Sequence, residues 1–322
     1  GLFHLIIKAL EKQPIIVHKD VSISFAQLLV LHTPSKEQIY SKRLMMIPLE
    51  AAQEEVGSFL MQVIGSSQKN KALIEKCAKS FFHLNAKLYC DLQPCDLVRA
   101  NNTVHTMLRV EKIVRVYNSF TMHIIVKSIL GQNEKVNRAR LIRFYLDLSC
   151  KSLKLNDLVT VYTIYSAFAH SSIGRLKVSF QEAFQVGSYK KKYKKMKKLL
   201  RITGNSMALR RYIADKRASN IALIPPISLV MSDILHTEEV QSISGYGTKR
   251  CYNYEKINTI YRLIQDYLYF KSSIKELGKK CFTESLKDNI FAQYLLQDLP
   301  CDAQIEDELY SISKELEAIT ID

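Results

Sequence analysis

Helical periodicity is the feature that most restricts how this chain can fold. In several long segments the apolar residues recur every three or four positions, which is the spacing of one face of an α-helix. The clearest stripe consists of Tyr254, Ile257, Tyr261, Ile264 and Leu268, and we expect the last four of these to face inward. Sustained alternation of apolar and polar residues, the pattern of a half-buried strand, does not occur. We predict an all-α, irregular multi-helix fold, because helix length and spacing vary too much for a coiled coil or a fixed-period solenoid.

Composition supports long helices and excludes several classes of protein. The 322 residues are 47% hydrophobic and include only ten Gly and seven Pro, so a sizeable core can form with few tight turns. No apolar run reaches the roughly 20 residues of a membrane span, and the N-terminus has no signal-peptide cleavage pattern. The seven Cys are odd in number and form no CxxC pair, which favours a reducing compartment over a zinc site or a disulfide framework. We therefore predict a cytoplasmic protein with no metal site.

The chain divides into three parts by pattern and charge. Residues 1–70 form an N-terminal helical segment interrupted by prolines, residues 71–275 carry the strongest periodicity, and residues 276–322 form C-terminal helices with an acidic tail. The net charge is +15, and the basic run Lys190–Lys198 concentrates much of it. Such a run is typical of a surface for nucleic acid or an anionic membrane, or of a solvated helix end. Tyr189 and Tyr193 are too few to make a base-stacking platform, so nucleic acid is the weaker of the two partners.

The motifs of covalent chemistry are missing. The sequence has no phosphate-binding loop, no HExxH and no GxSxG, and its eight His are scattered singly. We therefore expect a binding or regulatory function without a cofactor.

One helix stands out because two prolines precede it. In "IPPISLVMSDILHTEEV", Pro226 suits a first helical turn and Pro225 holds the preceding residue extended. At 100° per residue, the side predicted to be buried carries Ile227, Val230, Met231 and Ile234. A second side carries Ser228, Ser232, Leu235 and Glu239. Leu235 is thus an apolar residue on a polar stripe, one turn before Glu239. Two interpretations remain open from the pattern alone: a helix that enters the cleft of a partner with these two residues, or a single exposed leucine of the kind common on protein surfaces.

Six segments, in order, resemble the catalytic domain of Ras guanine-nucleotide exchange factors (RasGEF, Son-of-sevenless type). They span about Leu73 to Lys271 and read "KLYCDLQPCDLV", "RVYNSF", "LNDLVTVYTIYSAFAHSSIGRL", "NSMALRRY", "PPISLVMSDILHTEEV" and "YNYEKINTIYRLIQDY". The resemblance implies a protruding helical hairpin that opens the switch region of a Ras-family small GTPase and displaces Mg²⁺ and nucleotide. It implies that Leu235 lies near the magnesium site and that Glu239 disturbs the phosphate-binding elements. Such a factor acts by differential binding and not by covalent chemistry.

The resemblance also assigns roles to other residues. The GTPase-binding residues that it implies are Arg115, Asn156, Asp157 and Arg210. The residues that it implies as hairpin or structural support are Asn118, Asn205, Pro225, Pro226 and Asn253. Asp157 stands where the family usually has a second Asn, so the contact at that position differs from the family pattern.

Two alternatives remain open from the sequence: an all-α nucleic-acid-binding protein, and a GTPase-binding scaffold that has lost exchange activity. Residues 1–70 are in the position of a module that supports the hairpin in many relatives. The acidic tail resembles the C-terminal signals of type IV-secreted bacterial effectors, which implies action in a host cytosol.

Overall fold

The structure, a computed structural model, describes residues 49–65, 71–98, 104–241, 243–246, 249–281, 289–297, 299 and 303–317. The all-α prediction is confirmed. The body contains α4 (Leu49–Gly65), α5 (Lys71–Asp91), α6 (Pro94–Leu97), α7 (Val104–Ser119), the π-helix η1 (Phe120–Val126), α8 (Lys127–Leu130), α9 (Lys135–Lys154), α10 (Leu158–Ala169), α11 (Ser171–Gly174), α12 (Lys177–Phe184), α13 (Tyr189–Leu200) and α14 (Thr203–Ala218). The remaining elements are α15 (Ile227–Glu239), β1 (Ile243–Tyr246), β2 (Lys249–Tyr252), α16 (Tyr254–Cys281), α17 (Ile290–Leu295) and α18 (Ala303–Leu316).

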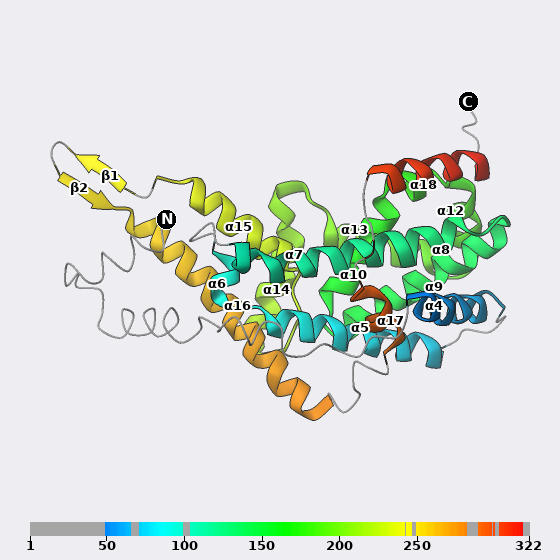
Figure 1. Cartoon of the computed structure of the whole chain (residues 1–322), viewed down its shortest axis with the longest axis horizontal. Helices are drawn as coiled ribbons and strands as arrows, with labels where there is room; N and C mark the ends of the chain where they lie inside the picture. The colour runs from blue at the N-terminus through cyan, green and yellow to red at the C-terminus, as the bar shows by residue number, and fades with distance from the viewer. Residues whose placement is uncertain are drawn as a thin grey trace.

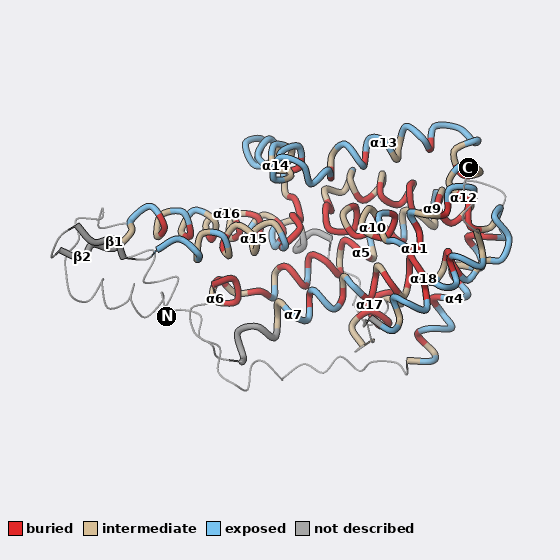
Figure 2. The backbone as a smooth tube through the Cα atoms, turned by 90° about the horizontal axis from the view of Figure 1, so that it is seen from above, coloured by how far each residue is buried: buried red, intermediate tan, exposed pale blue. Residues whose placement is uncertain are grey.

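Helix α9 lies at the centre of the body. It packs against α5, α10 and α12, and its side chains Leu141, Ile142, Leu146 and Leu148 are fully buried. Figure 2 shows this concentration of buried residues in the body and the larger exposed fraction of the outer helices. Burial of aliphatic side chains at this density, each contributing about 1.5–3 kcal/mol, holds the body together as one core.

The protruding hairpin is confirmed, and its tip differs from the prediction. Figure 1 shows α15, the two strands and the first part of α16 projecting from one end of the body. The strands form an antiparallel ribbon in which Ile243 pairs with Tyr252 and Tyr246 pairs with Lys249. Each strand has four residues, which is too short for an alternating pattern to be recognised in the sequence.

The predicted inner face of α16 is only partly right. Ile264 is buried as expected, whereas Ile257, Tyr261 and Leu268 are half-buried. The other residues that α16 buries are Lys256, Ile260, Tyr267, Phe270, Lys271 and Ile274. The reason is that α16 packs in turn on α15, α6 and α5, so its covered side changes along its length.

The flanking helices belong to the same body. Helix α4, the described part of residues 1–70, packs mainly on α17 and α9. Residues 1–48 lie outside the described part, and the predicted support of the hairpin by this segment stays a prediction. At the other end, the Glu317 carboxylate accepts hydrogen bonds from the backbone N–H groups of Val178 (2.9 Å) and Ser179 (3.0 Å) at the start of α12. The C-terminal helix is therefore fastened to the body, and the last residues of the acidic tail lie beyond the described chain.

Within the described ranges, no helix is both long enough and apolar enough to cross a membrane.

Candidate functional site

A cleft of about 350 Å³ lies where α7, η1 and α10 meet the start of α15. Its apolar wall consists of Val114, Tyr117, Met122, Val159 and Tyr162, together with Pro226 and Ile227. Its polar groups include Thr163, Ser166, His170, Ser228 and Glu306. An apolar hollow with a few polar groups is the usual form of a site that receives a side chain or a short segment of a partner.

The wall of the cleft contains an unusual backbone. Residues Phe120–Val126 form a π-helix between α7 and α8, and Thr121 and Met122 from this segment line the cleft. π-Helical turns are rare and occur frequently at functional sites. This observation marks the cleft independently of its composition.

A short backbone bridge holds the chain just before α15. The N–H of Ile224 donates to the carbonyl of Asn156 (2.9 Å), and the N–H of Leu158 donates to the carbonyl of Ile224 (3.1 Å). Asn156 adopts a left-handed conformation (φ 59°), which Asn tolerates better than most residues. Pro225 and Pro226 follow and are both buried, and Pro226 is the N-cap of the helix rather than its first turn. The support role of the two prolines stays a prediction, and the bridge gives Asn156 a structural contact.

Leu235 and Glu239 lie on the face of α15 that continues from the cleft. Ser228 lines the cleft, and positions 228, 232, 235 and 239 share one side of the helix. At 1.5 Å per residue, Leu235 and Glu239 lie roughly 10 Å and 16 Å farther along the hairpin. Leu235 is half-buried and Glu239 has a 79% exposed side chain. The two side chains therefore extend the surface of the cleft outward along the projecting helix.

The opposite side of α15 is covered less completely than predicted. Ile227 and Ile234 are buried, but Val230 and Met231 are only half-buried although they pack on the core. α15 packs on α16 and α6 and is joined to α14 through Arg210, and these contacts leave Val230 and Met231 partly open to solvent.

Helix α14 braces the hairpin with charged side chains. The Arg210 guanidinium donates to both carboxylate oxygens of Asp233 on α15, at 2.6 and 2.7 Å. It also donates to the backbone and side-chain oxygens of Asn205, at 2.8 and 3.2 Å. A second pair joins Arg217 to Asp266 on α16. Planar bidentate pairs fix orientation as well as distance, so α14 sets the direction in which the hairpin points.

These contacts give Arg210 a role within the chain. Its guanidinium is held by Asp233 on α15, which makes Arg210 a positioning residue for this helix. Its predicted contact with a GTPase stays a prediction. Asn205 anchors the same guanidinium, which supports its predicted structural role. Asp233, the partner of Arg210, was missed, because a lone acid within an apolar helix pattern does not reveal a partner 23 residues away.

A second brace closes the junction between α15 and α16. The side-chain amide of Asn253 donates to the carbonyl of Gln241, and its oxygen accepts from the N–H of Lys256. The buried Lys256 ammonium donates to the carbonyls of Glu238 (2.7 Å) and Val240 (2.5 Å). A cation at the last carbonyls of a helix satisfies acceptors that have no helical partner. Asn253 thus has the supporting contacts predicted for it, and Lys256 is a brace that the sequence did not indicate.

Asp157 was predicted to bind the GTPase, but its side chain is 0% exposed and cannot reach a partner. Its carboxylate accepts from Asn85 Nδ2 (3.2 and 3.0 Å), from Thr160 Oγ1 (2.6 Å) and from the Thr160 N–H at the start of α10 (3.1 Å). Burial raises the pKa of this carboxyl, and the hydrogen bonds from Thr160 and Asn85 oppose that shift. Asp157 is a helix cap that joins α10 to α5.

We expect Asp157→Ala to lower the free energy of unfolding by about 2–4 kcal/mol, because it removes a cap and leaves buried donors of Asn85 and Thr160 without an acceptor. A denaturant titration measures this loss. The partner affinity of the remaining folded protein is expected to stay unchanged. A variant that keeps its stability but binds the partner more weakly would show that Asp157 contacts the partner after all, contrary to what its burial indicates.

Asn118 and Arg115 lie on the outer side of α7. Asn118 is exposed at the cleft wall, and its role in hairpin or structural support stays a prediction. Arg115 is exposed and pairs with Glu111 one turn away, at 2.6 Å. An exposed pair of this kind contributes little to stability and separates easily, so Arg115 stays a predicted partner contact.

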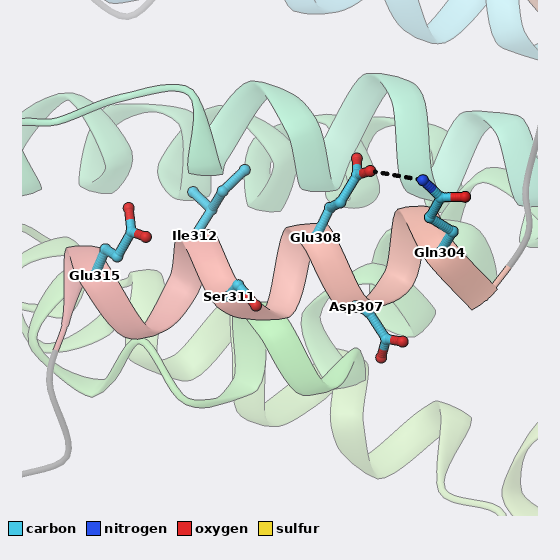
Figure 3. A pocket seen from close by; sticks show the side chains of 6 residues that line it. All are labelled: Gln304, Asp307, Glu308, Ser311, Ile312 and Glu315. Carbon is cyan, nitrogen blue, oxygen red and sulfur yellow. Dashed lines mark hydrogen bonds between the residues drawn. The ribbon is translucent and has the colours of Figure 1, made fainter.

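A second hollow lies along α18 and is a weaker candidate. Its six lining residues, Gln304, Asp307, Glu308, Ser311, Ile312 and Glu315, all come from this one helix. Figure 3 shows that these side chains diverge, with Glu308 and Asp307 on opposite sides, and that Gln304 donates to Glu308 (3.4 Å). Among the described residues, no group of three or more His, Cys, Asp or Glu side chains is placed to hold a metal ion.

Comparison with known proteins points to the same segment of the chain. The RasGEF domain family matches residues 76–258, which include all the cleft-lining residues except Glu306, together with α15 and both strands of the hairpin. The chain is 24% identical over 189 residues to Ras guanine nucleotide exchange factor D of Dictyostelium discoideum, covering 59% of this chain and 26% of the relative. It is 22% identical over 256 residues to Rap guanine nucleotide exchange factor 1 of Caenorhabditis elegans, covering 78% of this chain and 21% of the relative. The chain thus spans about a quarter of the length of these relatives.

Proposed function

The chain belongs to the RasGEF domain family, and we propose that it is a guanine-nucleotide exchange factor for a Ras-family small GTPase. The observation that carries this proposal is the continuous face from the cleft to Leu235 and Glu239 on a hairpin braced by Arg210 and Lys256. The names of the two relatives support the class of activity.

In the proposed mechanism the cleft holds a segment of the GTPase and the hairpin displaces another. An apolar side chain of the GTPase packs against the wall of the cleft formed by Tyr117, Met122 and Tyr162. The face of α15 then brings Leu235 against the magnesium site and Glu239 against the phosphate site. An apolar group cannot replace an oxygen ligand of Mg²⁺, and a carboxylate repels phosphate, so the bound nucleotide loses affinity.

The rigidity of the hairpin is essential to this mechanism. A partner that binds only the nucleotide-free state shifts the equilibrium by the difference in its affinity for the two states. If the hairpin bends when it contacts the GTPase, the difference between its affinities for the nucleotide-free and nucleotide-bound states becomes smaller. The ion pairs from α14 and the Lys256 contacts keep α15 in one direction before the GTPase arrives.

The decisive experiment is the release of fluorescent GDP from a panel of Ras, Rap and Ral GTPases, with and without the protein. We expect accelerated release from at least one GTPase and stable binding to its nucleotide-free form. Binding without acceleration would instead establish a scaffold. An absence of both, with tight and strongly salt-dependent RNA binding, would establish the nucleic-acid alternative.

A further inference from the structure

Helix α13 presents a basic face that the proposed exchange mechanism does not use. Its inner side is fixed to the body, with Tyr189, Met196 and Leu200 buried. Its outer side carries six exposed lysines: Lys190, Lys191, Lys194, Lys195, Lys197 and Lys198. None of the six forms an ion pair with a described residue, whereas Lys192 is held by Asp147. The exposed charge is therefore available to a partner of opposite sign.

Exposed apolar side chains adjoin this charge where α13 passes into α14. Ile202 is 71% exposed and Met207 is 59% exposed, next to the exposed Arg201. Between them, Gly204, Asn205 and Ser206 all have positive φ (66°, 54° and 55°), which makes a tight left-handed turn. Positive φ is unusual for Ser, and the Arg210 guanidinium donates to the backbone and side-chain oxygens of Asn205 within this turn. The turn holds two large apolar groups outward beside a cationic helix.

We propose that α13 and the turn after it form a docking surface for an anionic membrane. Lysines near an anionic bilayer are attracted to its surface potential, and adjacent apolar side chains enter the region between headgroups and acyl chains. A nucleic acid would use the charge but gain nothing from Ile202 and Met207. Nor does the surface offer rings for base stacking, because Tyr193 packs on Phe168, Phe180 and Phe184 and Tyr189 donates to Asp147.

The position of this surface leaves the cleft accessible. Figure 2 shows α13 and α14 along one edge of the molecule and α7 toward the other side. None of the described residues that line the cleft comes from α13 or α14. The protein can therefore lie on a membrane and hold a partner in the cleft at the same time.

The electrostatic part of the proposal is tested by sedimentation with vesicles of phosphatidylcholine alone or with phosphatidylserine. We expect the wild-type chain to bind only the anionic vesicles. Changing Lys190, Lys191, Lys194 and Lys195 to Glu should weaken this binding by about a hundredfold or more. The matched control reverses the same number of charges on α5, at Lys71, Lys76, Lys79 and Lys87, and should retain most of the affinity. Gln replacements at the α13 positions should act in the same direction with a smaller effect, and a thermal melt checks that each variant is folded.

The apolar part is tested by Ile202→Ser and Met207→Ser, which leave the charge unchanged. Each should weaken binding to anionic vesicles by several-fold to about tenfold. Equal loss of binding in the α13 and α5 variants would overturn the proposal, since it would mean that net charge alone is sensed. Tighter binding to a homopolymeric RNA than to vesicles, insensitive to the two Ser substitutions, would also overturn it in favour of nucleic acid.

Discussion

Leu235→Ala and Glu239→Ala are each expected to slow GDP release from the cognate GTPase by about thirtyfold, with little change in stability. Loss of a central interface side chain weakens a complex by about 2 kcal/mol or more, and 1.4 kcal/mol corresponds to a factor of ten. Glu239 is exposed, so its removal should change the free energy of unfolding by no more than about 0.5 kcal/mol. Leu235 is half-buried and does not belong to the side chains that pack on the described core. We therefore expect Leu235→Ala to lower the free energy of unfolding by about 1 kcal/mol.

Matched controls make this result specific. Val240→Ala and Glu255→Ala remove an exposed aliphatic group and an exposed carboxylate from the same hairpin, on either side of the strand ribbon. Both controls should release nucleotide at nearly the wild-type rate. Normal exchange by folded Leu235 and Glu239 variants would refute the wedge, and a collapsed melt for Leu235→Ala would show that this residue supports the core.

The features that the sequence predicted correctly are those set by local pattern. The start of α15 follows from Pro225 and Pro226, because each proline restricts its own φ and the conformation of its neighbour. The exposure of Glu239 and the burial of Ile227 and Ile234 follow from helical geometry alone. No distant contact is needed to derive any of these.

The predictions that failed depend on contacts between distant parts of the chain. Asp157 has the residue type of a surface contact, yet Asn85, 72 positions earlier, supplies the hydrogen bonds that make its burial possible. On α16, apolar residues occur on more than one side, so periodicity offers several candidate faces. Only the packing of α5, α6 and α15 selects between them. The strand ribbon at the hairpin tip is likewise stabilised by pairing and not by a pattern within either strand.

The pair formed by Arg210 and Asp233 provides the sharpest test of how the hairpin works. If α14 positions the wedge, Arg210→Ala and Asp233→Ala should both slow nucleotide release, by about tenfold, because small misplacements of a working group have large effects on rate. Each should lower the free energy of unfolding by only about 1 kcal/mol, since both side chains are partly exposed to solvent.

The double variant separates positioning from direct contact. When two residues act only through each other, the effects of replacing them do not add. The double variant Arg210→Ala/Asp233→Ala should therefore release GDP little more slowly than either single variant. The measured release rates give this coupling directly. Arg211→Ala, an exposed neighbour on α14, is the matched control and should exchange normally. If Arg210 instead binds the GTPase itself, Asp233→Ala would free the guanidinium and leave release unchanged or faster. The response to Asp233→Ala therefore decides whether this arginine serves the fold of the hairpin or the surface of its partner.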